Sequence, residues 1–120
     1  MLQARRMADQ YFLPHHKLRA YQAACELLKA VHAAQIADLK LRDQAIRAAK
    51  SACLNIAEAV GRTAGGDRRR VYAIARGETC EALAAVEIAA SVGECTQDAL
   101  QAAQASAEKT YALLTGLMRI

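Results

Sequence analysis

One run of the chain, residues 44–62, places hydrogen-bonding and charged side chains at helical spacing. They follow one another in steps of three or four residues: Gln44, Arg47, Ser51, Asn55, Glu58 and Arg62. At about 100° per residue, these steps predict one narrow polar stripe along a helix. Ser51 and Asn55 are mediocre helix formers, so a stripe that only faces water has no need of them. We expect the stripe to contact a neighbouring helix or subunit, or else a ligand or nucleic acid.

Two residues further along the chain are unusual for the helix on which they are predicted to lie. Glu78 falls on the apolar side, where an unpaired carboxylate costs several kcal/mol. We therefore expect a cationic or hydrogen-bonding partner for Glu78, and prefer a structural pair to a catalytic acid. Gly77 costs about 1 kcal/mol relative to alanine in a helix interior. Its presence predicts the close approach of another backbone.

A third group of charged residues surrounds a turn that contains Gly65 and Gly66. The basic members of this group are Arg62, Arg68, Arg69 and Arg70. Residues 1–70 carry 13 Lys and Arg against 6 Asp and Glu, whereas residues 71–120 carry 3 against 6. The basic half is therefore the candidate contact surface for nucleic acid or a protein partner. The simpler interpretation is a solvated turn.

The residue patterns of common enzyme and metal sites do not occur in the chain. No Glu is followed three residues later by His, so the Glu-x-x-His pairs of a di-iron bundle are missing. No triad or phosphate loop is recognisable. The four cysteines form no Cys-x-x-Cys pair: Cys25, Cys53, Cys80 and Cys95. We expect a non-catalytic protein without metal or cofactor, and buried or half-buried free thiols.

Composition and periodicity predict the elements that position these residues. Of the 120 residues 29 are alanine and one is proline, which favours closely packed helices around a thin core. Residues 1–13 are expected to form an arm or short extra helix, and four long helices are expected near 14–35, 38–62, 68–92 and 96–118. Asp38, Asp67 and Thr96 are the expected N-caps, and Gly93 ends the third helix. The short connections predict one domain over residues 14–120, an all-α, antiparallel up-down-up-down four-helix bundle.

The apolar periodicity of each helix predicts which residues face the core. In the first helix these residues are Leu18, Tyr21, Cys25, Leu28 and His32, and in the second they are Ala45, Ala49, Ala52, Cys53, Ile56 and Val60. In the third helix they are Val71, Ile74, Ala75, Ala82, Val86 and Ala89. In the fourth helix they are Leu100, Ala103, Ala107, Tyr111, Leu114 and Met118. No uncharged run is long enough to cross a bilayer and no secretory leader is recognisable. We expect a soluble, cytoplasmic protein.

The polar stripe and the predicted third helix resemble the small bacterial four-helix-bundle proteins encoded in intervening sequences of large-subunit ribosomal RNA genes. Members of that family commonly show Gln-x-x-Arg-Ala-x-x-Ser, then Asn-Ile-Ala-Glu-Gly with an Arg shortly after, then Ala-x-Gly-Ser-x-x-Glu. The matching residues here are Gln44, Arg47, Ala48, Ser51, Asn55, Ile56, Ala57, Glu58, Arg62, Ala75, Gly77 and Glu81. Ala59 and Glu78 stand where the family usually has Gly and Ser. The resemblance spans about residues 17–118.

This resemblance implies a homo-oligomer in the form of a homopentameric ring, but no settled activity. The chain is also similar to the accessory protein of diversity-generating retroelements, a ring-forming bundle understood to bind nucleic acid and a reverse transcriptase. One hypothesis is therefore a ring-forming adaptor that binds nucleic acid, a protein partner, or both. The alternative is a purely structural or regulatory oligomer. In a ring of five, the net charge of +4 per chain becomes +20, which favours phosphate binding.

Overall fold

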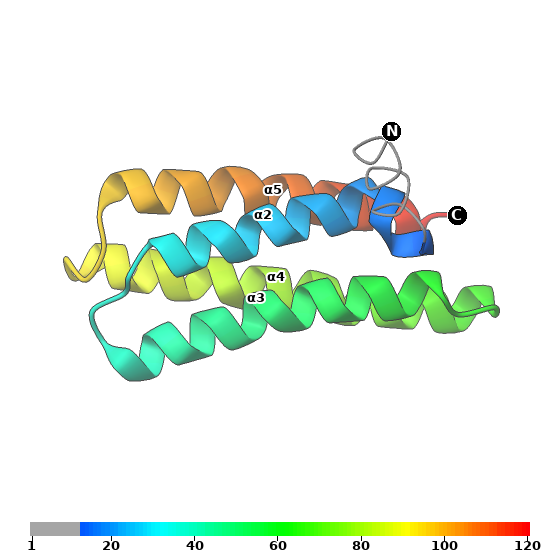
Figure 1. Ribbon diagram of the computed structural model, residues 1–120, viewed down its shortest axis with the longest axis horizontal. Helices are drawn as coiled ribbons and strands as arrows, with labels where there is room; N and C mark the ends of the chain where they lie inside the picture. Colours follow the sequence, from blue (N-terminus) through cyan, green and yellow to red (C-terminus); the bar gives the residue numbers. More distant parts are fainter. Residues whose placement is uncertain (1–12) are drawn as a thin grey trace, which may run out of the picture.

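A computed structural model describes residues 13–120, which form one short and four long helices (Figure 1). They are the 3-10 helix η1 (Pro14–Lys17), α2 (Arg19–Ala33), α3 (Leu39–Val60), α4 (Gly65–Ser91) and α5 (Gln97–Met118). The long helices alternate in direction, which confirms the four-helix bundle. Residues 1–12 of the predicted N-terminal arm lie outside the described residues.

Several predicted helix ends are confirmed by their capping contacts. The carboxylate of Asp38 accepts a hydrogen bond from the backbone N–H of Leu41 (3.2 Å), which fixes the start of α3. The hydroxyl of Thr96 accepts one from the N–H of Ala99 (3.1 Å) at the start of α5. Gly93 has a φ of +75°, so a residue without a side chain ends the turn after α4.

Two predicted starts are wrong. Pro14 begins η1 rather than the first long helix, because Leu18 is extended (φ −75°, ψ 121°) and separates η1 from α2. The helix α4 begins at Gly65, three residues before the predicted position, and its N-cap is Ala64. Asp67 is therefore not a cap but an acidic residue of the first turn, where the positive end of the helix dipole favours it.

The core is built largely from alanine. Of the 25 buried hydrophobic residues, 16 are alanine, so helix axes must approach closely to exclude water. The larger buried residues form two clusters, one around Leu27, Ile36 and Val86 and the other around Ile56 and Leu114. The most extensive helix contact joins α3 to α4, the two helices that carry the motif residues.

The predicted apolar faces are confirmed for α3 and corrected elsewhere. In α2 the alanines occupy the centre of the helix contact, and the buried residues are Ala20, Ala23, Ala24, Leu27 and Val31. The predicted α2 face is rotated away from the core, because His32 is exposed and its four other members are only half-buried. Ile74 and Tyr111 are 42% and 43% exposed, so their assignment to the core is wrong. The ring of Tyr111 lies instead under the guanidinium of Arg76, 5.1 Å from ring centroid to Cζ.

The four cysteines are free and differ in their surroundings. Cys53 is buried in the contact between α2 and α3, while Cys25 and Cys95 are half-buried. Cys80 is exposed, which corrects the expectation that all four thiols are shielded. Within residues 13–120, no helix is long and apolar enough to cross a membrane.

We predict that Ile56→Ala destabilises the bundle by about 2–5 kcal/mol, because it leaves a cavity where a fully buried side chain was. Urea unfolding followed by circular dichroism measures the change. Leu54→Ala removes a side chain of the same size that is 70% exposed, two residues away, and should change the free energy of unfolding by less than about 0.5 kcal/mol. Equal effects of the two substitutions would contradict the assigned orientation of α3.

We also predict a contribution of Cys53 to the pH dependence of stability. Burial raises the pKa of this thiol from 9.0 to about 12. Between these two values the unfolded chain binds fewer protons than the folded chain, so the free energy of unfolding falls as the pH rises. From pH 8 to pH 10, the wild type should lose about 1 kcal/mol more than Cys53→Ala in urea titrations. Cys80→Ala, at the exposed cysteine, is the control, and a loss in Cys53→Ala equal to that of the wild type would refute the prediction.

Candidate nucleic-acid interface

The polar stripe of α3 lies along its outward side, and Arg47 reaches from it to α4. One guanidinium nitrogen of Arg47 lies 2.9 Å from a carboxylate oxygen of Glu81, and the other lies 3.7 Å from Glu78. The side chain of Glu78 is only 22% exposed, so Arg47 supplies the cationic partner expected for it. Arg47 thus joins the motif residues of the two helices.

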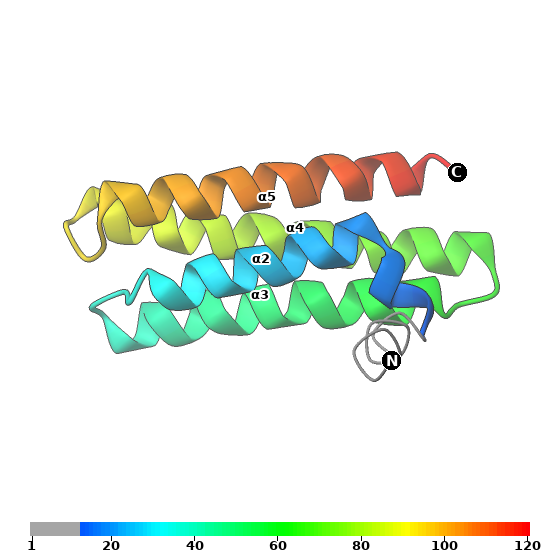
Figure 2. The ribbon, with the colours of Figure 1, turned by 45° about the horizontal axis from the view of Figure 1, so that its top comes forward.

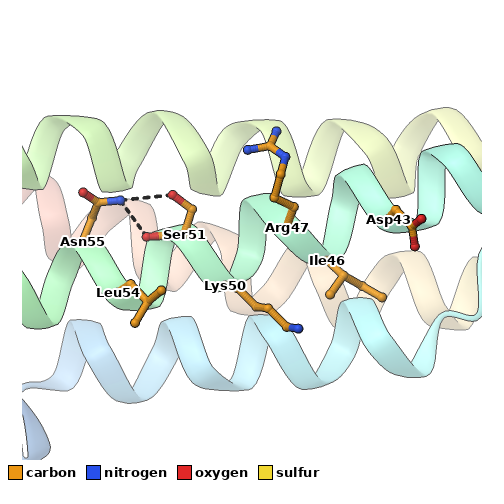
Figure 3. Close-up of a pocket in the computed structure, with 7 residues that line it drawn as sticks. All are labelled: Asp43, Ile46, Arg47, Lys50, Ser51, Leu54 and Asn55. Carbon is orange, nitrogen blue, oxygen red and sulfur yellow. Dashed lines mark hydrogen bonds between the residues drawn. The ribbon is translucent and has the colours of Figure 1, made fainter.

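Ser51 and Asn55 bond to each other instead of to a neighbouring helix. The amide of Asn55 donates to the backbone carbonyl of Ser51 (2.8 Å) and to its hydroxyl (3.1 Å). Figure 3 shows both side chains on the edge of α3 nearest α4, while Lys50 and Leu54 lie toward α2. Among the stripe residues, Arg47 meets the expectation of a partner on another helix through Glu81, and Arg62 meets it through Asp67. These residues line a shallow hollow on the surface of α3.

Gly77 does not approach another backbone within the chain, so that prediction is wrong for a single copy. A Cβ added at this position would meet no atom within 4 Å. Gly77 is exposed on the outer side of α4. The conformational cost of glycine in this helix therefore has no compensation inside the subunit.

The turn between α3 and α4 is held by a network of ion pairs. Arg62 contacts the carboxylate of Glu58 and, at 2.9 Å, that of Asp67. The second oxygen of Asp67 lies 3.3 Å from Arg70. The hydrogen bond that Arg62 donates to Glu58 and the charge of Asp67 raise the pKa of Arg62 above its ordinary value. Arg62 is thus a structural residue of the turn.

Arg68 holds the turn that follows α3. It donates from one nitrogen to the backbone carbonyls of Arg62 and Thr63, both at 3.0 Å. Both carbonyls belong to the turn that follows the C-cap Gly61 of α3, so the guanidinium satisfies groups that otherwise need water. Of the four arginines predicted for the contact surface, Arg62 and Arg68 therefore hold the turn together.

Arg69 and Arg70 are exposed, and the fold gathers further cations beside them. Arg69 donates to the carbonyl of Ile120 at 3.4 Å, which brings the turn next to Arg119. The described start of the chain, the α3–α4 turn and the C-terminus lie at the same end of the bundle (Figures 1 and 2). Lys17 and Arg19 therefore join the arginines of the turn at what we call the basic end.

The two ends of the bundle differ in charge. Within residues 13–120, we count each end of the bundle as its connections and the described ends of the chain, together with the six adjoining residues of each long helix. The basic end has seven Lys and Arg against two acidic residues, a net charge of +5: Lys17, Arg19, Arg62, Arg68, Arg69, Arg70 and Arg119 against Glu58 and Asp67. The opposite end has three against five, a net charge of −2: Lys29, Lys40 and Arg42 against Asp38, Asp43, Glu87, Glu94 and Asp98.

Sequence reasoning missed the contributions of Lys17, Arg19 and Arg119. Lys17 and Arg19 lie near the start of the first long helix and Arg119 lies after the last one, and only the antiparallel topology places them beside the turn. The basic end offers guanidinium groups that can donate two parallel hydrogen bonds to a phosphate. Among residues 13–120, no group of three His, Cys, Asp or Glu side chains is placed to hold a metal ion.

Comparison with known proteins identifies the family of the chain. The family model described as 23S rRNA-intervening sequence protein matches residues 16–116, and the chain belongs to this family. This confirms the resemblance carried by the motif residues of α3 and α4, while the similarity to the retroelement accessory protein stays a prediction. No curated protein matches the chain.

We predict that Arg68→Ala destabilises the fold by about 1–2 kcal/mol, because two carbonyls of the turn between α3 and α4 lose a charged donor. Arg69→Ala removes the same side chain at the next position and should change stability by less than about 0.5 kcal/mol. Urea unfolding of both variants measures the difference. If the Arg68 variant is as stable as the Arg69 variant, Arg68 does not hold the turn as we describe.

Proposed function

We propose that this member of the 23S rRNA-intervening sequence protein family is a non-catalytic, homo-oligomeric adaptor that binds nucleic acid through the basic end of its bundle. The observation that carries the proposal is the net charge of +5 gathered there from three separate parts of the chain. Following the resemblance of the sequence, the assembly we propose is a ring of five copies. We place its action in the cytoplasm.

The basic end has the properties that phosphate binding requires. Arg69 and Arg119 are exposed, and Arg62 and Arg68 hold the turn that presents Arg69. Because the turn is already ordered, binding costs less conformational entropy. Arginine at such a position can bind the phosphate backbone of either RNA or DNA.

The proposed binding is tolerant of nucleotide sequence. Discrimination between bases requires hydrogen bonds or stacking at base edges and faces. Tyr72 in α4 is 5% exposed and belongs to the core. The other described aromatic rings at this end, His15, His16 and Tyr21, are half-buried, and His15 packs against the other two at 4.4 and 4.8 Å between centroids. The contacts available at the basic end are therefore mainly to phosphate. An acidic surface on a protein partner would use the same cations.

One observation favours the alternative of a purely structural or regulatory oligomer. Arg62, Arg68 and Arg70 all bond within the subunit, to the carboxylate of Asp67 or to backbone carbonyls. In that alternative the charges stabilise the turn and keep the particle soluble. The two functions predict different effects on nucleic-acid binding when the charges of the exposed arginines are reversed.

We expect Arg69→Glu/Arg119→Glu to abolish nucleic-acid binding without changing the oligomer. Fluorescence anisotropy with single- and double-stranded RNA and DNA measures the affinity at 50 and 200 mM salt. An assembly that contacts six to ten phosphates should lose about 10³–10⁵-fold in affinity between these concentrations.

The matched control is Lys40→Glu/Lys50→Glu, which makes the same change in net charge on exposed residues outside the basic end. If both double variants lose affinity equally, binding is a property of total charge and not of the basic end. If the wild type shows no salt-dependent binding at micromolar concentration, the structural or regulatory alternative replaces the proposal.

A further inference from the structure

A groove between α2 and α5 leads away from the basic end along the side of the bundle. The two helices pack side by side (Figure 1), and two hollows of about 380 and 450 Å³ lie between them. Arg19 lines both hollows, so they adjoin each other. Along α5 they extend from Leu117 to Ala105, a length of about 18 Å at 1.5 Å per residue. We call the two hollows together the α2–α5 groove.

The cations of the α2–α5 groove are not engaged by other described residues. Lys17, Arg19 and Lys109 line the groove, and all three are exposed. Among residues 13–120, no ion pair joins their charged groups to a carboxylate, whereas three of the four arginines of the turn bond within the subunit. These cations can therefore bind a phosphate chain without first breaking an internal contact.

The lining of the groove has an excess of positive charge. Its three cations face one acidic side chain, Glu26, which lies at the end away from the turn and is itself 3.2 Å from Lys29. The hollow on α3 is less suited to an anion, because its Arg47 is bound to Glu81 and its lining includes Asp43. The α2–α5 groove is therefore the hollow that best complements a polyanion.

The shape and the apolar residues of the groove fit one strand of nucleic acid better than two. Packed helices lie about 8–10 Å apart, whereas the major groove of a duplex alone is about 12 Å wide, so a duplex touches only the rim. Leu113 and Leu117 are half-buried beside the cations and offer apolar contact to uncovered bases. A duplex keeps its base faces stacked inside and cannot use these leucines.

We propose that the α2–α5 groove holds a single strand of RNA or DNA that continues from the basic end. The proposal deepens the proposed function, on which it rests, by naming the form of nucleic acid. Lys17, Arg19 and Lys109 bind phosphates of the strand, and the hydroxyl of Ser106, which also lines the groove, is a further donor. At the 3.4 Å per nucleotide of a stacked strand, a groove of this length holds about five nucleotides.

Lys109 distinguishes the groove from the basic end, because it lines the groove but lies outside the basic end. With a single strand of about ten nucleotides, Lys109→Gln should weaken binding about five- to tenfold at 50 mM salt. The slope of log affinity against log salt should fall by about 0.7, the loss of one phosphate contact. Fluorescence anisotropy measures both. Lys50→Gln is the matched control on an exposed residue of α3, and an equal loss in the two variants overturns the proposal.

Gly116 gives an independent test of the shape of the groove. A Cβ added at this position meets no atom within 4 Å, so the side chain of Gly116→Leu stands in the groove without disturbing the subunit. We expect the wild type to bind the single strand about tenfold more tightly than a duplex of equal length, and Gly116→Leu to lose this preference. Gly77→Leu, at another exposed helical glycine with open space around it, is the matched control on α4 and should keep the preference.

A wild type that binds the duplex as tightly as the single strand overturns the proposal, as does a Gly116→Leu variant that keeps the preference. Displacement of the strand by poly-glutamate at equal charge also overturns it, because the groove then accepts any acidic chain. The Arg69→Glu/Arg119→Glu variant reports binding at the basic end, while Lys109→Gln reports binding in the groove. Either proposal can therefore fail without the other.

Discussion

The close packing of α3 against α4 is the constraint on which the rest of the structure depends. Alanines along the facing sides of the two helices let their backbones approach, and little other apolar volume is available to fill a wider gap. Two ion pairs also join these helices: Arg47 with Glu81 along the contact, and Arg62 with Asp67 at the turn. A larger residue in this contact would separate the helices and move the turn that presents the exposed cations.

The arginines at the basic end have two different roles. Arg62 and Arg68 satisfy a carboxylate and backbone carbonyls, so removing them affects the turn itself. Arg69 projects from the start of α4, next to the turn that these residues hold in place, and Arg119 lies beside it after the end of α5. The motif that identifies the family includes Arg47 and Arg62, both bound within the subunit. The family pattern therefore describes the scaffold more than the proposed contact surface.

The helices and their antiparallel order could be predicted because periodicity and capping residues are local properties of the chain. The rotation of α2 could not, because alanine and leucine are both apolar, and only packing decides which of them takes the centre of a contact. Asp67 was predicted as a cap, but its arginine neighbours hold it within the first turn of α4. The contribution of Arg119 to the basic end depends on residues far apart in sequence, so no local pattern contains it.

The unequal charge of the two ends has a consequence for how the protein meets a polyanion. A rod with a net charge of +5 at one end and −2 at the other has a permanent dipole along its length. In the field of a phosphate chain, such a rod rotates before contact, so that its positive end leads and its negative end trails. Collisions then begin with the basic end foremost more often than chance allows, and added ions weaken this orienting effect by shortening the range of the field.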